Sequence, residues 1–257
     1  MELTFYKYQG TGNDFVMVDN RQQIFNKKDT AFISFLCDRR FGIGADGLIL
    51  LETHESCDFR MVYFNADGNE SSMCGNGGRC ITAFANFLGV IKDTATFEAI
   101  DGLHKAKIEN GLVSLQMQDV SSIETYESHT FLDTGSPHHI QMANDLASFD
   151  VKTIGRQIRS GEPYNEEGSN VNFVSKNSDD SFSVRTYERG VEDETYSCGT
   201  GVTAVALAMH YIGETEKKLI TLETEGGTLK VSFEKGHGSY ENIWLIGPAT
   251  QVYKGHI

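Results

Sequence analysis

The stretch MCGNGGRCITAFANFLG at residues 73–89 has a counterpart later in the chain, SCGTGVTAVALAMHYIG at residues 197–213. The two stretches align without a gap at an offset of 124 residues, so that Cys74 matches Cys198. Further matches at this offset are Gly75 with Gly199, Gly77 with Gly201, Gly89 with Gly213 and Tyr63 with Tyr187. This register predicts two structurally equivalent halves, each presenting one thiol.

Each cysteine stands immediately before a segment with helical periodicity. Apolar residues recur at helical spacing at positions 81, 84, 85 and 88, and again at 202, 205, 206 and 209. A cysteine at a helix N-terminus has its thiolate stabilised by the backbone N–H groups of the first turn and by the helix dipole. The neighbouring glycines would let a ligand carboxylate approach the same N–H groups. One motif can therefore supply both a base and an anion site.

Composition limits the class of protein. The 257 residues, of which 39% are hydrophobic, are enough for one large or two ordinary globular domains. The net charge of −14 and the absence of a basic run argue against nucleic acid as a partner. The N-terminal sequence lacks the pattern of a signal peptide, and the longest apolar stretch is too short to span a bilayer. We expect a cytoplasmic protein that does not associate with membranes.

Short β-type runs dominate the rest of the chain, and turn signals separate them. The expected strands are 3–8, 15–19, 48–51, 59–65, 95–100, 112–117, 171–174, 182–187, 219–223, 229–233 and 243–246. Asn110-Gly111 and Gly226-Gly227 are typical of hairpins, which favours antiparallel pairing. Weaker helices are expected at 30–39 and 152–159. The helix after Cys198 is apolar nearly all round and must be enclosed.

These elements predict an α+β fold of the α/β roll type. We expect two pseudo-symmetric halves, each a curved, mainly antiparallel sheet wrapped around a central helix, with the two cysteines facing each other across a cleft. The polar stretch 119–128 suggests a first half of 1–118 and a second half of 119–248. The last residues, 249–257, could return to the first half.

Several other motifs have a simpler interpretation. Five cysteines without close pairs argue against a disulfide framework, and the spacing of Cys74 and Cys80 is not one that closed zinc sites use. We expect no metal site. We also expect Cys37, Cys57 and Cys80 to be buried, inert thiols. His138 and His139 would face opposite sides of a strand, so that one of them at most serves a given site. The glycine-rich segments 10–15 and 42–47 do not lead from a strand into a helix, so we interpret them as ligand-facing turns.

Six segments taken together resemble the diaminopimelate epimerase family. They are Gly10–Phe15, Gly42–Gly47, Phe64–Gly68, Met73–Cys80, Tyr187–Gly190 and Cys198–Gly201. The resemblance implies two pseudo-symmetric α/β halves around a cleft, commonly a homodimer, and an epimerase without pyridoxal phosphate or any other cofactor. The implied reaction interconverts LL- and meso-diaminopimelate in lysine and cell-wall precursor biosynthesis.

The implied reaction gives a reason for two cysteines. Inverting the α-carbon of an amino acid requires one acid/base group on each face, and Cys74 and Cys198 would serve as a thiolate and thiol that exchange roles. By the same resemblance the substrate carboxylate would lie on the N–H groups of Gly75, Asn76, Gly199 and Thr200. The remaining implied contacts are Asn13, Asn65, Asn172 and Arg189 for the distal end of the substrate, Glu188 for the reacting ammonium, and His138 as a polar group near the thiols. Two departures from the family pattern are Ser136, where many members have asparagine, and Gly47, where some have glutamine.

Two other interpretations remain open at this point. A related two-thiol racemase acting on proline or hydroxyproline would not need the distal set of Asn13, Asn65, Asn172 and Arg189. A thiol redox or metal-binding protein would be a different class, which zinc analysis and activity in chelator would separate from an epimerase.

Overall fold

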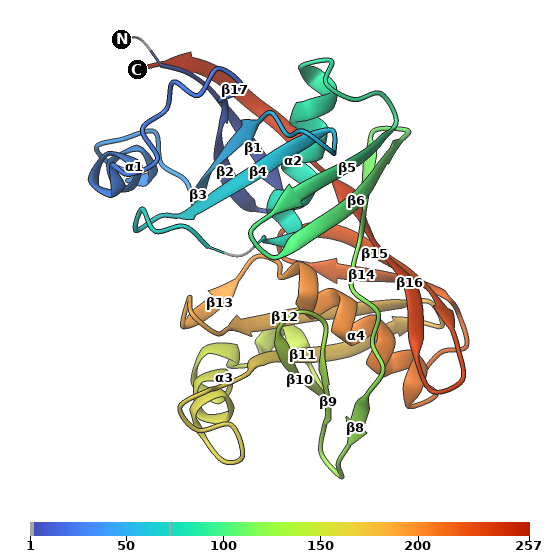
Figure 1. The fold of residues 1–257 in the computed structure, drawn as a ribbon. Coiled ribbons are helices and arrows are strands. Elements are labelled where there is room, and N and C mark those ends of the chain that lie inside the picture. Colours follow the sequence, from blue (N-terminus) through green and yellow to red (C-terminus); the bar gives the residue numbers. More distant parts are fainter. Residues whose placement is uncertain (1–2, 72) are drawn as a thin grey trace. The chain divides into compact units, whose positions relative to one another are not determined.

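The computed structural model describes residues 3–71 and 73–257. They form two compact units (Figure 1). Unit 1 is the chain up to Leu115 together with Gly247–Ile257, and unit 2 is Gln116–Ile246. Within the described residues, no helix is long and apolar enough to cross a membrane.

Unit 1 is a mixed sheet with two helices. Its strands are β1 (Thr4–Gly10), β2 (Asn13–Asp19), β3 (Gly47–Glu52), β4 (Phe59–Asn65), β5 (Thr94–Ala99), β6 (Gly102–Glu109), β7 (Leu112–Gln116) and β17 (Thr250–His256), and its helices are α1 (Thr30–Cys37) and α2 (Gly75–Phe87). Strands β2 and β3, and strands β4 and β5, pair in parallel, and the other neighbours are antiparallel. The C-terminal strand β17 pairs with β1, so the end of the chain belongs to unit 1.

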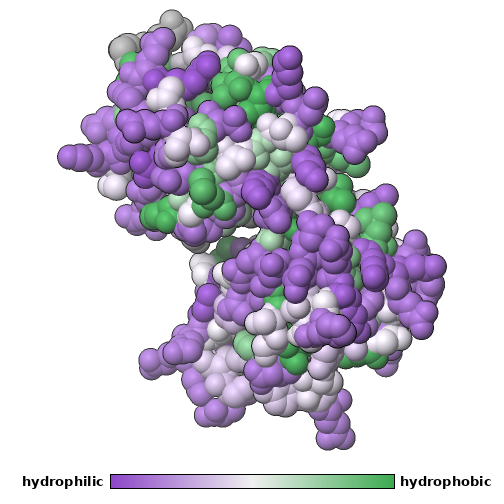
Figure 2. Space-filling model, turned by 45° about the vertical axis from the view of Figure 1, so that its right-hand side comes forward, coloured by the Kyte–Doolittle hydropathy of each residue, from purple (hydrophilic) through white to green (hydrophobic). Residues whose placement is uncertain are grey.

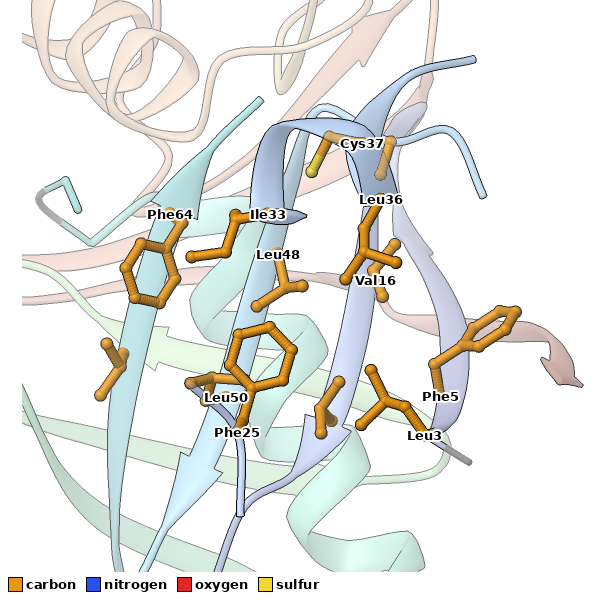
Figure 3. Close-up of a cluster of buried hydrophobic side chains, with 13 residues drawn as sticks. Leu3, Phe5, Val16, Phe25, Ile33, Leu36, Cys37, Leu48, Leu50 and Phe64 are labelled. Carbon is orange, nitrogen blue, oxygen red and sulfur yellow. The ribbon is translucent and has the colours of Figure 1, made fainter. Parts of the chain in front are cut away.

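The two helices of unit 1 cover opposite faces of its sheet. Val16 and Leu48 point toward Ile33 and Leu36 of α1 in the cluster drawn in Figure 3. The alternate positions face α2, where a Cβ at Gly77 would lie 3.1 Å from Ile49 Cδ1. All six residues of β3 are buried. A strand covered on both faces is expected to be a continuous apolar run rather than an alternating one.

Unit 2 has the same plan. Its strands are β8 (Ile123–Thr125), β9 (Thr130–Asp133), β10 (Pro137–Met142), β11 (Asn170–Ser178), β12 (Ser181–Glu188), β13 (Asp193–Thr195), β14 (Leu219–Thr224), β15 (Gly227–Lys235) and β16 (Tyr240–Pro248), and its helices are η1 (Leu146–Ser148), α3 (Val151–Ser160) and α4 (Gly199–Tyr211). The central helix α4 packs against β9–β12, β14 and β15. The apolar cluster of Val171, Phe173 and Tyr187 includes Val151 of α3.

The predicted equivalence of the two halves is confirmed in detail. Helices α2 and α4 both contain 13 residues and begin 124 residues apart. Each ends at a glycine in the left-handed region, Gly89 with φ +71° and Gly213 with φ +82°. Beyond these glycines, Val90 N donates to Ala85 O and Glu214 N to Met209 O, both at 2.9 Å. Only glycine adopts this helix-ending conformation without a steric cost, which explains its presence at both sites.

The secondary structure departs from the expectation in two respects. The hairpins at Asn110-Gly111 and Gly226-Gly227 are present, but β2–β3, β4–β5, β10–β11 and β12–β14 pair in parallel. Strand β6 and the short strands β8, β9 and β13 were not expected. In β6, Ala106 is the one buried residue and the other positions are largely polar. Strand β6 is held by backbone hydrogen bonds to β5 and β7, and its own sequence pattern does not predict this pairing.

Candidate functional site

Cys74 and Cys198 are the N-cap residues of α2 and α4. Both have extended backbone angles, and the carbonyl of each accepts the first bond of its helix, from Gly78 N at 2.7 Å and from Val202 N at 2.9 Å. Cys74 is half-buried, and Cys198 is buried with 8% of its surface exposed. The helix N-termini predicted from the sequence are therefore confirmed, and each thiol stands at the positive end of a helix dipole.

In unit 1 the predicted residues Asn13 and Asn76 lie beside Cys74. The Cys74 thiol donates to Asn13 Oδ1 at 3.4 Å, and Asn76 Nδ2 donates to the same oxygen at 3.5 Å. Asn13 is the first residue of β2, directly after the two-residue turn of Thr11 (φ +51°) and Gly12 (φ +87°). A tight hairpin of this type fixes the strand register and with it the position of Asn13.

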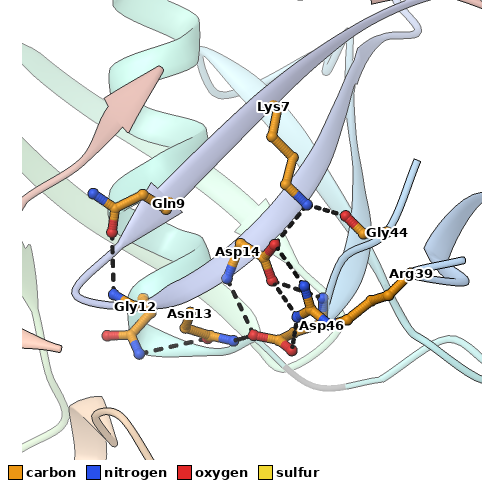
Figure 4. A network of polar contacts seen from close by, with 9 residues as sticks. Lys7, Gln9, Gly12, Asn13, Asp14, Arg39, Gly44 and Asp46 are labelled. Atoms are coloured by element: carbon orange, nitrogen blue, oxygen red, sulfur yellow. Dashed lines mark hydrogen bonds and ion pairs between the residues drawn. The ribbon is translucent and has the colours of Figure 1, made fainter. Parts of the chain in front are cut away.

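A network of charged side chains supports Asn13 from behind (Figure 4). Asn13 Nδ2 donates to Asp46 Oδ2 at 2.6 Å, and Arg39 bridges Asp46 and Asp14 at 2.8 and 2.7 Å. Lys7, which is 6% exposed, pairs with Asp14 at 2.6 Å and also donates to the carbonyl of Gly44. The pKa of Asp14 lies below its usual value because Arg39 and Lys7 outweigh the effect of burial. Asp14 therefore stays ionised at neutral pH.

In unit 2 the predicted residues Asn172, Thr200 and His138 gather around Cys198. The Sγ of Cys198 lies 3.4 Å from Thr200 Oγ1, and a Cβ at Gly201 would meet both Cys198 Sγ and Asn172 Oδ1 at 3.3 and 2.6 Å. Asn172 is fully buried, and its Nδ2 donates to His138 Nδ1 at 3.1 Å. Asn172 thus links the histidine to the turn that carries the thiol.

His138 is a neutral imidazole. Burial, with a smaller contribution from Arg189, lowers its pKa to about 3. Because Nδ1 accepts from Asn172, the ring proton is on Nε2. Nε2 is buried and has no hydrogen-bond partner among the described residues. His139 faces the other side of β10, as expected, where its Nδ1 lies 3.0 Å from the Tyr164 hydroxyl.

The remaining predicted residues lie at the ends of β4 and β12. Asn65 ends β4 with an exposed side chain, and Arg189, its equivalent at the offset of 124 residues, follows β12. The guanidinium of Arg189 donates to Glu167 O at 3.0 Å, and Glu188 Oε2 accepts from Thr195 Oγ1 at 2.9 Å. Asn65, Glu188 and Arg189 therefore form a second group of candidates, at the ends of strands β4 and β12.

Two polar residues that support these groups were missed from the sequence. Asp46 holds Asn13, while Asn170 donates to Ser136 Oγ at 2.8 Å and accepts from Arg189 N at 2.9 Å. The two are equivalent at the offset of 124 residues, and each lies at the start of a strand, β3 or β11. Extending the repeat beyond the cysteine motifs would have identified both.

The two departures from the family pattern have different surroundings. The Ser136 hydroxyl accepts a hydrogen bond from Asn170 Nδ2, so it belongs to the same hydrogen-bonded group as Asn170 in unit 2. At Gly47 a Cβ would lie 2.5 Å from both Phe64 O and Tyr63 Cε2, so a side chain there would require the chain to shift. The absence of a side chain at Gly47 therefore allows the Tyr63 ring to lie close to the backbone in this protein.

The other cysteines have thiols with raised pKa values. Burial raises the pKa of Cys37 to about 11 and that of Cys80 to about 12, which agrees with inert, buried thiols. The expectation that Cys57 is buried is wrong, because this residue is half-buried. Its pKa is nevertheless raised as well. Among the residues that the structure describes, no group of three or more His, Cys, Asp or Glu side chains is arranged to hold a metal ion.

Comparison with known proteins places the chain in a family. The sequence model of the family described as diaminopimelate epimerase matches residues 5–122 and 130–252. The chain belongs to the diaminopimelate epimerase family. The diaminopimelate epimerase of Flavobacterium psychrophilum is 58% identical over 253 residues, covering 98% of this chain and 99% of the relative. That of Chlorobaculum tepidum is 44% identical over 259 residues, covering 96% and 98%.

Solved structures share the fold at much lower identity. A phenazine biosynthesis protein of the PhzF family from Bacillus anthracis has a TM-score of 0.79 at 14% identity, covering 100% of this chain and 99% of that one. A hydroxyproline epimerase from Agrobacterium vitis has a TM-score of 0.69 at 15% identity, covering 100% and 92%. The family's two-unit α+β architecture is thus shared with proteins that have other names, and these likenesses concern the fold alone.

Proposed function

We propose that this protein interconverts LL- and meso-diaminopimelate by moving a proton at one α-carbon between two thiols. The observation that carries the proposal is the presence of a cysteine at the N-cap of the central helix in each unit, at equivalent positions. A base on each face of the carbon is what inversion requires, and family membership supports diaminopimelate as the substrate.

In the proposed reaction one cysteine is a thiolate and the other a thiol. The thiolate takes the α-proton and becomes a thiol, and the electron pair left on the carbon is delocalised into the substrate carboxylate. The second thiol then gives its proton to the opposite face of the carbon and becomes the thiolate. No atom is gained or lost, so Cys74 and Cys198 have exchanged protonation states and the direction of the next turnover is reversed.

The glycine-rich first turns of α2 and α4 would receive the charge that develops on the carboxylate. The backbone N–H groups of Gly75, Asn76, Gly199 and Thr200 lie at the positive ends of the two helices. We assign Glu188 to the reacting ammonium, and Asn13, Asn65, Asn172 and Arg189 to the distal amino-acid end. His138, neutral and with its proton on Nε2, is suited to donating a hydrogen bond without adding charge.

The cellular setting is part of the proposal. We infer that the enzyme works as a cytoplasmic homodimer without a cofactor and contributes to lysine and cell-wall precursor biosynthesis. A reducing compartment suits a reaction that needs two reduced thiols. Light scattering coupled to size exclusion would test the dimer, with a mass near 57 kDa expected from twice the chain mass of 28.5 kDa.

Proton NMR in deuterium oxide with LL-diaminopimelate tests the activity. Loss of the α-proton signal together with appearance of the meso isomer is expected from fresh, reduced protein, and activity should survive chelator. L-proline and trans-4-hydroxy-L-proline serve as comparison substrates, because a related two-thiol racemase is the second candidate and a hydroxyproline epimerase shares the fold. Exchange with these and none with diaminopimelate would contradict the proposal.

A further inference from the structure

The guanidinium of Arg189 is held by the main chain of a neighbouring segment. This segment, residues 161–168, lies between α3 and β11 in unit 2. Arg189 is half-buried, and its Nη1 donates to Glu167 O at 3.0 Å, the acceptor that the described residues offer to this guanidinium. An arginine presents five N–H donors in a fixed plane. The remaining N–H groups are therefore available to a ligand, in the geometry that suits a carboxylate.

The peptide between Glu167 and Gly168 determines the direction of that carbonyl. Gly168 N donates to Tyr164 O at 3.1 Å. The N–H and C=O of a trans peptide lie in one plane and point in opposite directions. The bond to Tyr164 O therefore turns the Glu167 carbonyl to the opposite side, where Arg189 lies. Gly168 is buried with φ +68°, which favours glycine, and a Cβ there would collide with the Arg159 guanidinium.

Tyr164 anchors this segment to the sheet of unit 2. Its hydroxyl lies 3.0 Å from His139 Nδ1 in β10, and its ring stacks on Phe131 of β9 with the centroids 5.7 Å apart. Burial lowers the pKa of His139 to about 4, so the ring is neutral at physiological pH. His139 Nε2 lies 3.3 Å from Gln141 Oε1, which can only accept, so Nε2 carries the proton. The Tyr164 hydroxyl therefore donates to Nδ1.

The backbone that carries Arg189 is fixed by other contacts. Arg189 N donates to Asn170 Oδ1 at 2.9 Å, and Gly190 N donates to Glu192 Oε1 at 3.0 Å. Arg159 pairs with the same carboxylate at 2.9 Å. The turn is thus held without Tyr164, and the contact to Glu167 O concerns the Arg189 side chain alone.

A second arginine of the same strand shows a different arrangement. Arg185 of β12 makes a two-pronged ion pair with Glu194, at 2.6 and 2.8 Å, so its charge is compensated within the protein. The carbonyl that holds Arg189 is neutral, and it leaves the charge of Arg189 available to an anion. A long side chain loses rotamer freedom when it binds a ligand, and holding it in advance reduces that loss.

We propose that Tyr164 is a positioning residue that, through the Glu167 carbonyl, holds the Arg189 guanidinium ready for the distal carboxylate of the substrate. The inference deepens the proposed function and rests on it for the identity of that carboxylate. Loss of the anchor should weaken the binding of ligands that carry a distal carboxylate and leave the proton transfer itself unchanged.

Nitrogen relaxation of the Arg189 Nε–H group, measured by NMR without substrate, tests the positioning. In the unmodified protein its order parameter should exceed that of the exposed Arg40. Tyr164→Phe keeps the ring, removes the hydroxyl and should lower the Arg189 value. Tyr126→Phe is the matched control, because it removes a tyrosine hydroxyl that donates to Glu124 at 2.5 Å, outside the segment.

Three results would overturn the positioning role. They are an Arg189 order parameter no higher than that of Arg40, a value unchanged by Tyr164→Phe, and a value lowered equally by Tyr126→Phe. If Tyr164→Phe does not fold, the comparison of Arg189 with Arg40 in the unmodified protein decides.

Two inhibitors of α-proton exchange test the ligand. L-α-Aminopimelate retains the distal carboxylate of diaminopimelate and lacks the distal ammonium, whereas L-lysine retains the ammonium and lacks the carboxylate. Tyr164→Phe should raise the KM for diaminopimelate and the inhibition constant of aminopimelate about two- to tenfold, the effect of one hydrogen bond, with kcat and the lysine constant unchanged. Equal weakening of both inhibitors, or a lower kcat at native KM, would overturn the proposal. The expected order parameters without any exchange of diaminopimelate would refute the proposed function alone.

Discussion

Asp46 determines which end of the Asn13 amide meets the thiol of unit 1. Asp46 Oδ2 accepts from Asn13 Nδ2 at 2.6 Å, and a carboxylate can only accept. The amide nitrogen is therefore directed at Asp46, and Asn13 Oδ1 is left to accept from Cys74 Sγ at 3.4 Å. Asp46 is held in turn by Arg39 at 2.8 Å.

This relationship predicts that Asp46→Ala slows the reaction although Asp46 does not contact Cys74. Without its acceptor the Asn13 amide can turn over, and we expect a loss of about 1–3 kcal/mol, or roughly ten- to hundredfold in kcat for α-proton exchange. The exposed carboxylate of Asp179, which pairs loosely with Lys217 at 3.7 Å, supplies the control variant Asp179→Ala. A native kcat for Asp46→Ala would rule out the orienting role.

Cys74→Ala and Cys198→Ala should each abolish epimerisation. A single acid/base group cannot serve both faces of the carbon, so a loss of at least about a thousandfold in kcat is expected for either change. Deuterium incorporation by NMR gives the rate, and Cys57→Ser, at a half-buried thiol away from both helix ends, is the control. Near-native turnover by either alanine variant would show that the two-base assignment is wrong.

Arg189→Ala should impair the use of diaminopimelate without altering the thiols. A charged distal carboxylate would lose its partner in a desolvated site, at a cost of about 2–5 kcal/mol in kcat/KM. Asn65→Ala, at the equivalent position of unit 1, should act in the same direction. Alkylation rates of Cys74 and Cys198 should stay native in both, and Arg21→Ala, which removes a surface ion pair with Asp19, is the control. Normal kinetics in both test variants would favour a smaller amino acid as substrate.

Mild oxidation without substrate should join Cys74 to Cys198 and inactivate the enzyme. The proposed mechanism requires both sulfurs to reach one carbon atom, and thiolate character favours disulfide formation. Reductant should restore activity, and bound substrate should protect against the loss. Peptide mapping is the measurement, and inactivation accompanied by a Cys74 to Cys80 peptide instead would contradict the arrangement.

Stability should fall as the pH drops below neutrality, in part because of His139. Burial, together with His129, lowers the pKa of His139 to about 4 in the folded protein. The unfolded chain takes up this proton near pH 6.5, so between pH 6.5 and pH 4 it binds more protons and folding becomes less favourable. Between pH 7.5 and pH 5.5 the free energy of unfolding should therefore fall by about 1.4 kcal/mol less in His139→Gln than in the unmodified protein. Urea unfolding at the two pH values measures this, with the exposed His237→Gln as control, and an identical loss in all three proteins would refute it.

Local patterns determined much of this protein. The apolar spacing after Cys74 and Cys198 was sufficient to predict α2 and α4 with the thiols at their N-termini, and the glycines at 89 and 213 mark where both helices end. Helix periodicity, capping and turn chemistry depend on residues a few positions apart, so they can be recognised in the sequence. The offset of 124 residues extended these local features to the equivalence of two halves.

The tertiary structure alone decided which buried polar groups lie near the residues that contact the thiols. Arg79 is buried because Thr11, 68 residues away, and Pro248, 169 residues away, enclose its guanidinium. Asp46 meets Asn13 only because β2 and β3 pair in parallel, which was not expected from the sequence. Burial and charge compensation are sums over neighbours brought together by strand pairing, and a sequence pattern does not contain those neighbours. The thiols could therefore be located from the sequence, whereas the buried polar groups near them could be identified only from the fold.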